Sequence, residues 1–170
     1  MFYTSSNSGL QFAWASFAMK INWVQIGKGR MALGHRPKLR AIPFLPAEGC
    51  GCVVTLLSEK EGALEIGSVV RESAIRWIWI PLATGNPPQK TPNELHEIEE
   101  AIHAGFSVFI HCSAGMHRTG MIALAVLRRI GYTEAQSLEL IKAMRIETFA
   151  ALNQKHIGWA NSTVKINSEP

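Results

Sequence analysis

The stretch FSVFIHCSAGMHRTGMIALAVLRRIG, residues 106–131, decides the fold that this sequence predicts. FSVFIH (106–111) is a short continuous apolar run, which is typical of a strand buried on both faces of a sheet. From Thr119 a longer apolar segment indicates a helix, and Gly131 ends it. The short loop between them therefore lies at the carboxyl end of a strand, which is where open α/β sheets bind their ligands.

The rest of the chain indicates a layered α/β domain, because predicted strands and helices alternate early and helices dominate the end. Further strands are expected at INWVQI (21–26), RMALG (30–34), CVVTLL (52–57) and IRWIWI (75–80), and further helices at 91–105, 133–145 and 147–159. Thr91 with Glu94, and Thr133 with Gln136, form capping boxes at the starts of two of these helices. The two apolar runs CVVTLL and IRWIWI both predict strands buried on both faces, so the sheet is expected to be largely parallel.

The composition limits the possible function classes. A chain of 170 residues most simply forms one domain, and its net charge of +4 is too mild and scattered to indicate nucleic-acid binding. The same charge suits an anionic substrate. All 13 acidic residues are glutamates, so the chain contains no aspartate.

Cysteine usage and hydropathy favour a protein of the reducing cytoplasm with no membrane segment. Cys50, Cys52 and Cys112 are an odd set without a disulfide-framework spacing. No stretch approaches the roughly 18 apolar residues that a membrane span needs. We expect residues 1–20 to form an N-terminal extension, 21–162 the folded domain that carries the function and 163–170 a C-terminal tail, and the protein to be a monomer.

The loop HCSAGMHRTG, residues 111–120, has the composition of a tetrahedral-oxyanion site. Its backbone N–H groups lack carbonyl partners and lie at a helix N-terminus, Gly115 permits a conformation closed to other residues, and Arg118 offers a planar fork for two phosphate oxygens. The same field lowers the pKa of the Cys112 thiol and makes it a nucleophilic thiolate. The loop residues expected to bind the substrate are Ser113, Ala114, Gly115, Met116 and His117.

A thiolate at the base of an oxyanion site predicts in-line attack on phosphorus. The expected intermediate is a phosphocysteine on Cys112, which water then hydrolyses, while Arg118 and the amides stabilise the equatorial oxygens. Thr119 can hydrogen-bond the sulfur as it departs, and His111 is expected to support the loop by hydrogen-bonding backbone carbonyls.

HCSAGMHRTG resembles the signature loop of the protein tyrosine phosphatase superfamily: histidine, cysteine, five residues, arginine, and serine or threonine. The short chain is similar to the dual-specificity branch, and GCVVTLLSEKEG and RIETFAALNQKHIGW resemble its flanking segments, so that the likeness covers about residues 20–160. The resemblance implies a central, mostly parallel sheet of four or five strands flanked by helices. It also implies phosphate-ester hydrolysis without metal or cofactor, with Cys112 as nucleophile and Arg118 as phosphate clamp.

The sequence departs from the family pattern at the general acid. The family places an aspartate on the loop that follows the strand matching IRWIWI, where this chain reads PLATGNPP (81–88). Thr84 lies closest to that position, and a threonine hydroxyl has far too high a pKa to protonate a leaving alkoxide. Glu59 or Glu61 in the loop after strand 52–57, His117 within the signature loop, or no acid at all are the alternatives.

The predicted function is therefore a cysteine-dependent phosphatase acting on phosphotyrosine, with phosphoserine and phosphothreonine as further substrates. The alternatives are a phosphate-binding module without catalysis and a phosphatase for a non-protein substrate such as an RNA 5′-phosphate or a sugar phosphate. The absence of lysine inside the loop argues mildly against a polyphosphorylated lipid. An arsenate-reducing or sulfur-transferring enzyme is disfavoured because no cysteine follows Cys112.

Overall fold

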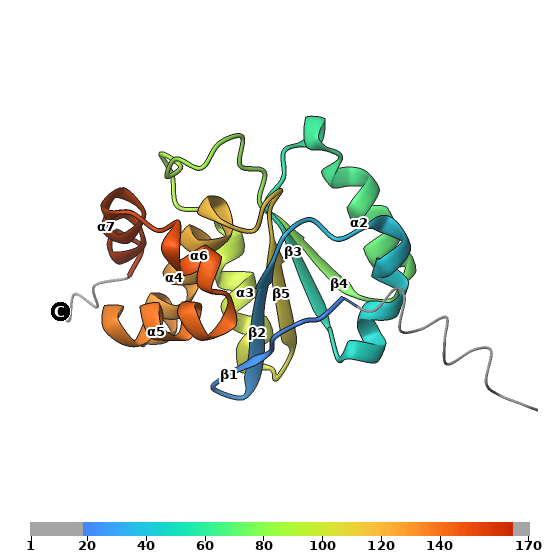
Figure 1. Ribbon diagram of the computed structural model, residues 1–170, viewed down its shortest axis with the longest axis horizontal. Helices are drawn as coiled ribbons and strands as arrows, with labels where there is room; N and C mark the ends of the chain where they lie inside the picture. The colour runs from blue at the N-terminus through green and yellow to red at the C-terminus, as the bar shows by residue number, and fades with distance from the viewer. Residues whose placement is uncertain (1–18, 165–170) are drawn as a thin grey trace, which may run out of the picture.

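A computed structural model describes residues 19–164 of the chain, and within them the strands form one five-stranded sheet (Figure 1). The strands are β1 (Val24–Ile26), β2 (Gly29–Gly34), β3 (Cys52–Thr55), β4 (Arg76–Trp79) and β5 (Ser107–His111). Their spatial order is β1-β2-β5-β3-β4, and all neighbours are parallel except the β1–β2 hairpin. The predicted α/β fold with a mostly parallel central sheet is confirmed.

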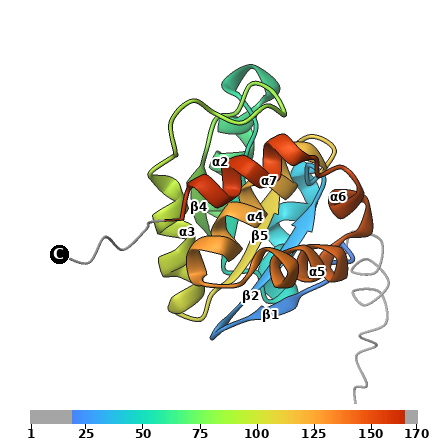
Figure 2. The ribbon, with the colours of Figure 1, turned by 90° about the vertical axis from the view of Figure 1, so that its left-hand side faces the viewer.

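Helices cover both faces of the sheet (Figure 1). One face carries the 3-10 helix η1 (Leu39–Glu48) and α2 (Ala63–Glu72), with a short 3-10 turn η2 (Glu59–Glu61) just before α2. The other face carries α3 (Glu94–His103), α4 (His117–Ile130), α5 (Glu134–Met144), α6 (Ile146–Ala150) and α7 (Gln154–Ser162). Figure 2 looks onto this second layer, with α4 near its centre.

The central position of α4 explains its sequence. Every residue from Thr119 to Leu127 is buried, because α3, α5, α6 and α7 pack around this helix and the sheet lies beneath it. An apolar segment of this kind is typical of a helix enclosed on all sides. Gly131 ends it in the left-handed conformation, at φ +116°, as the sequence predicts.

Strand β5 is the middle strand of the sheet, and all five of its residues are buried. Its register pairs Phe109 with Val53 and His111 with Thr55 on β3. Register partners in a sheet point to the same face. The end of β5 therefore delivers Cys112 to the centre of the carboxyl edge of the sheet.

Two expected helices differ from the structure. Helix α3 begins at Glu94, and its N-cap residue Asn93 makes no side-chain cap, so the capping box expected at Thr91 is wrong. The segment expected as one helix over 147–159 is two helices, α6 and α7. Asn153 separates them because its side chain accepts hydrogen bonds from the first N–H groups of α7 and so favours a helix start there.

Strand β4 lies at the edge of the sheet, so IRWIWI is only half-buried where two buried faces were expected. Helix α2 was not predicted at all. Gly62 caps its start and Gly67 interrupts its interior, which hides a helical pattern.

The expected boundaries near residues 20 and 162 stay predictions, since residues 1–18 and 165–170 lie outside the described part of the chain. No helix within residues 19–164 has the length and apolar character needed to cross a membrane.

Candidate active site

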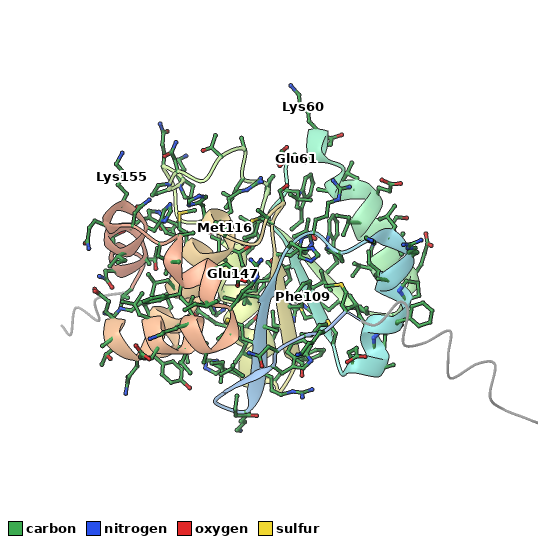
Figure 3. The ribbon with its side chains drawn as sticks, viewed as in Figure 1. Lys60, Glu61, Phe109, Met116, Glu147 and Lys155 are labelled. Atoms are coloured by element: carbon green, nitrogen blue, oxygen red, sulfur yellow. The ribbon has the colours of Figure 1, made fainter. Side chains whose placement is uncertain are left out.

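The loop between β5 and α4 curls around the sulfur of Cys112. Cys112 directly follows β5, and α4 begins at His117, two residues earlier than expected. Gly115 in this loop has φ +69°, and a Cβ atom there would lie 2.3 Å from the carbonyl oxygen of Gly34. Only glycine meets both conditions. Figure 3 shows Met116 of this loop above Phe109, at the same end of the molecule as Glu61.

The surroundings of Cys112 favour its thiolate form. Burial alone raises the pKa of the thiol, but the Thr119 hydroxyl and the backbone N–H groups of Thr119, Met116 and Gly115 together outweigh burial and lower that pKa below its ordinary value. The Gly115 N–H donates to Sγ at 3.2 Å. The Thr119 hydroxyl is buried and has no hydrogen-bond partner within residues 19–164 by distance and angle. The contact between Thr119 and the sulfur stays a prediction.

The other two cysteines have a different environment. Cys50 and Cys52 are buried and free, and burial raises the pKa of Cys50 to about 11 and that of Cys52 to about 12. They stay protonated thiols at neutral pH. Among the three cysteines, Cys112 alone lies in an environment that lowers the thiol pKa.

Donors from outside hold the loop carbonyls. The Gly115 carbonyl accepts from Arg145 Nη1 at 2.6 Å and from the Thr148 hydroxyl at 2.5 Å. The Ser113 carbonyl accepts from the Arg36 backbone N–H at 3.1 Å. With the carbonyls bound on the outside, the loop amides are free to face inward. Sequence reasoning missed Arg145, Thr148 and Arg36, because nothing in the signature itself indicates residues so distant along the chain.

Arg118 is held on one edge of its guanidinium and free on the other. Nη1 donates to Glu61 Oε2 at 2.8 Å and to the Leu82 carbonyl at 2.8 Å, and Nη2 donates to Glu61 Oε1 at 2.9 Å. The remaining edge, Nε–H with the second hydrogen of Nη2, has no oxygen partner among the described residues, and Arg118 interacts with Cys112 through its charge and through a side-chain hydrogen bond. This free edge has the geometry to bind two oxygens of a phosphate.

Glu61 is fixed in its ionised form. Its Oε2 atom also accepts from the Ser58 backbone N–H and from the Ser58 hydroxyl, each at 2.9 Å. The hydrogen bonds from Arg118 lower the pKa of Glu61 to about 2. A carboxylate held ionised in this way cannot act as a proton donor near neutral pH, so the structure gives Glu61 a role in holding Arg118.

A cavity of about 170 Å³ lies over the loop. It is lined by Ala83, Thr84, Gly85, Cys112, Ser113, Ala114, Met116, His117 and Arg118. Four of the five expected substrate-binding residues line it, and Gly115 does not. Thr84, which stands nearest the expected acid position, also lines the cavity and accepts from the Asn86 backbone N–H at 3.2 Å.

Glu59 lies outside this cavity. It is exposed and lines a neighbouring open cavity with Ser58, Lys60 and Ala83. Ala83 is the one residue that lines both spaces. Glu59 therefore lies outside the cavity that contains Cys112, whereas His117 lines the same cavity as the thiol. Within residues 19–164 no cluster of three or more metal-binding side chains occurs.

His117 and His156 connect the loop of residues 81–90 to the helical layer. His117 Nδ1 donates to the Ala151 carbonyl at 3.1 Å, and His156 Nε2 donates to the Gly85 carbonyl at 2.8 Å. Their ring centroids lie 5.9 Å apart. Since a carbonyl only accepts, Nδ1 of His117 carries a proton.

Residues 73–139 match the family model described as tyrosine phosphatase family. A comparison with curated protein sequences finds no match. Among solved structures, kinase associated phosphatase with its catalytic cysteine replaced by serine superposes with a TM-score of 0.67 at 15% identity, covering 85% of this chain and 93% of that one.

Two further structures give similar values. Tk-PTP in its active form has a TM-score of 0.66 at 19% identity and covers 85% of this chain and 97% of its own. PTPMT1 in complex with PI(5)P has a TM-score of 0.67 at 16% identity and covers 84% and 94%. The fold of these phosphatases is thus the fold of this chain, and the resemblance to the protein tyrosine phosphatase superfamily is confirmed.

Proposed function

We propose that this chain, a protein with the fold of protein tyrosine phosphatases, hydrolyses phosphate monoesters through a phosphocysteine intermediate on Cys112. One observation carries the proposal: a thiol with a lowered pKa lies beneath inward-facing amides, in one cavity with the free edge of Arg118. These are the groups that nucleophilic attack on a phosphate needs.

In the first step the Cys112 sulfur attacks phosphorus and forms the S–P bond, while the bond between phosphorus and the ester oxygen breaks. The loop amides and the Nε–H and Nη2–H of Arg118 bind the equatorial oxygens, where negative charge increases in the transition state. Glu61 holds the opposite edge of the guanidinium, so the fork is already oriented before the substrate arrives. The leaving oxygen departs with both bonding electrons and needs a proton.

His117 is the proposed proton donor for that oxygen. Of the residues that line the cavity, only Cys112, His117 and Arg118 have acidic or basic side chains, and Cys112 and Arg118 are the proposed nucleophile and clamp. A protonated His117 can donate from Nε2, because its Nδ1–H is occupied by the Ala151 carbonyl. An aryl phosphate, whose leaving group is already good, needs this proton less.

In the second step a water oxygen attacks phosphorus, the S–P bond breaks and inorganic phosphate is released. The sulfur leaves as a thiolate, which the Thr119 hydroxyl and the Gly115 N–H stabilise. The neutral Nε2 of His117 can accept the proton of the attacking water, which returns the ring to its charged form. The site then regains its starting state.

The proposed substrates are phosphotyrosine and other phosphate monoesters, with phosphoserine and phosphothreonine included. The PTPMT1 structure contains PI(5)P, so a non-protein phosphate ester is the alternative substrate class. A phosphate-binding protein without turnover is the second candidate function. It is favoured by one observation, namely that no carboxylate lines the cavity.

Rapid quenching tests the proposal. An aryl phosphate labelled with ³²P is mixed with the protein, the reaction is stopped within the first turnover by alkaline denaturant, and label on Cys112 is measured by peptide mapping. We expect transient label on wild-type protein and none on Cys112→Ser. Turnover that persists in Cys112→Ser excludes the proposed nucleophile, and binding without turnover in wild type identifies the phosphate-binding alternative.

A further inference from the structure

Three neighbouring strands place an indole, a hydroxyl and an imidazole in a row that ends at the active-site cysteine. Trp77 on β4 donates from Nε1 to Thr55 Oγ1 on β3 at 2.9 Å. Thr55 Oγ1 lies 2.9 Å from His111 Nε2 on β5, and His111 Nδ1 lies 3.3 Å from the Cys112 carbonyl oxygen. Thr55 and His111 are fully buried, so no water replaces these contacts.

The direction of each hydrogen bond follows from which of the two atoms carries a hydrogen. An indole N–H only donates, so Thr55 Oγ1 accepts from Trp77 and has its own hydrogen left for His111 Nε2. Nε2 therefore carries a lone pair, and the proton of the neutral ring lies on Nδ1. The Cys112 carbonyl only accepts, so its contact with Nδ1 is made in the same tautomer.

We propose that Trp77 and Thr55 are positioning residues for the active site, because they fix His111 in the Nδ1–H tautomer. This N–H then holds the Cys112 carbonyl on the outside of the signature loop. The inference rests on the proposed function only for its effect on turnover. The tautomer itself follows from the hydrogen-bond row.

The fold holds Trp77 in the orientation that this row needs. A Cβ atom at Gly67 of α2 would lie 2.5 Å from the Trp77 ring, so glycine lets the helix pack directly on the indole. The Arg71 guanidinium lies 4.8 Å from the ring centroid, and the stacked Trp79 ring lies 5.7 Å away. A glycine inside a helix costs roughly 0.5–1 kcal/mol relative to alanine, and close packing on Trp77 explains its presence here.

The charge state of His111 is consistent with this arrangement. Burial lowers the pKa of His111 to about 4, and the positive charges of Arg36 and Arg118 and the nearby His35 ring act in the same direction. The ring is therefore neutral at pH 7 and has one proton to place. In the other tautomer the Nδ1 lone pair would face the carbonyl oxygen, and the first peptide of the loop would rotate away from it.

The experiment measures the tautomer and the thiol separately. ¹⁵N chemical shifts of the imidazole nitrogens report the tautomer, with His111→Gln used to assign the signals. Iodoacetamide alkylation across pH reports the thiolate fraction of Cys112. We expect the Nδ1–H tautomer in wild type, a mixture in Trp77→Phe, and an alkylation rate at pH 7 reduced about fivefold in that variant, which corresponds to the loss of one net hydrogen bond.

Trp79→Phe is the matched control, because it removes an indole N–H that donates to the Leu57 carbonyl and not to Thr55. It leaves the tautomer of His111 unchanged. Thr55→Val gives the mixed tautomer and the slower alkylation, and Thr55→Ser restores both. A wild-type protein with the proton on Nε2, or a Trp77→Phe variant with wild-type shifts and alkylation, overturns the proposal. Neither measurement requires turnover, so the proposed function and this inference can fail independently.

Discussion

Glu61 and Arg118 form a bidentate pair, with the carboxylate oxygens 2.8 and 2.9 Å from Nη1 and Nη2. The pair joins the turn before α2 to the N-terminus of α4 and leaves the Nε edge of the guanidinium toward the cavity. Glu61, one of the acid candidates from the sequence, thus orients the guanidinium that we propose as the phosphate clamp.

Glu61→Gln should reduce kcat/KM about 10- to 100-fold, mainly through a higher KM for phosphate esters. The amide can accept from only one of the two guanidinium nitrogens, so the fork loses its orientation. Steady-state kinetics and inorganic-phosphate inhibition measure the effect. Glu65→Gln, an exposed substitution on α2, is the control. An unchanged KM in Glu61→Gln would show that Arg118 needs no partner.

Arg118→Lys should reduce kcat/KM by at least about 100-fold, because an ammonium group cannot bind Glu61 and two phosphate oxygens in a planar arrangement. The comparison is Arg129→Lys on the same helix, whose partners Glu99 and Thr163 are remote from the cavity. Rates with an aryl phosphate measure both variants. A rate for Arg118→Lys within threefold of wild type contradicts the clamp assignment.

His117→Asn should slow hydrolysis of alkyl phosphates much more than that of aryl phosphates. The proton matters most when the leaving group is poor, so a plot of log kcat against leaving-group pKa becomes steeper. Glu59→Gln, across Ala83 in the neighbouring cavity, should leave the slope as it is. The reverse pattern assigns the acid to Glu59, and a steep slope in wild type means that no acid acts.

The pH dependence of Cys112 alkylation should show the thiol ionising below the ordinary cysteine pKa of about 8.5. The sign is set by the hydrogen bonds to sulfur, which favour the charged form: the thiolate fraction rises with pH, and its midpoint lies below that of an ordinary thiol. Glu61, with a pKa of about 2, stays ionised throughout and adds no step above pH 4. Thr119→Val should move the curve to higher pH, and an unmoved curve would exclude the hydroxyl as a ligand of sulfur.

Gly115→Ala should destabilise the fold by about 2–5 kcal/mol and abolish activity. Its Cβ would lie 2.3 Å from the Gly34 oxygen, and its φ of +69° disfavours any side chain. Gly158→Ala is the control, since nothing lies within 4 Å of a Cβ there and the site is inside α7. That variant should gain roughly 0.5–1 kcal/mol. Urea denaturation measures both, and equal stability of the two variants refutes the argument.

The sequence predicts the features that depend on local patterns. The apolar run of β5, the following loop and the helix ended by Gly131 are recognisable because burial on all sides leaves a continuous apolar segment. The roles proposed for Cys112, Gly115 and Arg118 follow from the chemistry of the residue types, and the structure brings these residues together.

Partners that are distant along the chain leave no such pattern. Nothing near Glu61 indicates that it lies beside Arg118, because β3 and β5 must first pair to bring the two loops together. The same holds for Trp77, whose indole reaches His111 only across two strands. Helix α2 escaped prediction because Gly67, which weakens a helical pattern, serves the packing on Trp77.

The two side chains that donate to the Gly115 carbonyl set a lower limit on the length of chain that can hold the signature loop in place. Arg145 and Thr148 lie beyond residue 139, where the match to the family model ends. A fragment cut at that residue would contain Cys112 and Arg118, but it would lack both side chains that donate to the Gly115 carbonyl. Any minimised version of this protein must therefore extend at least through α6.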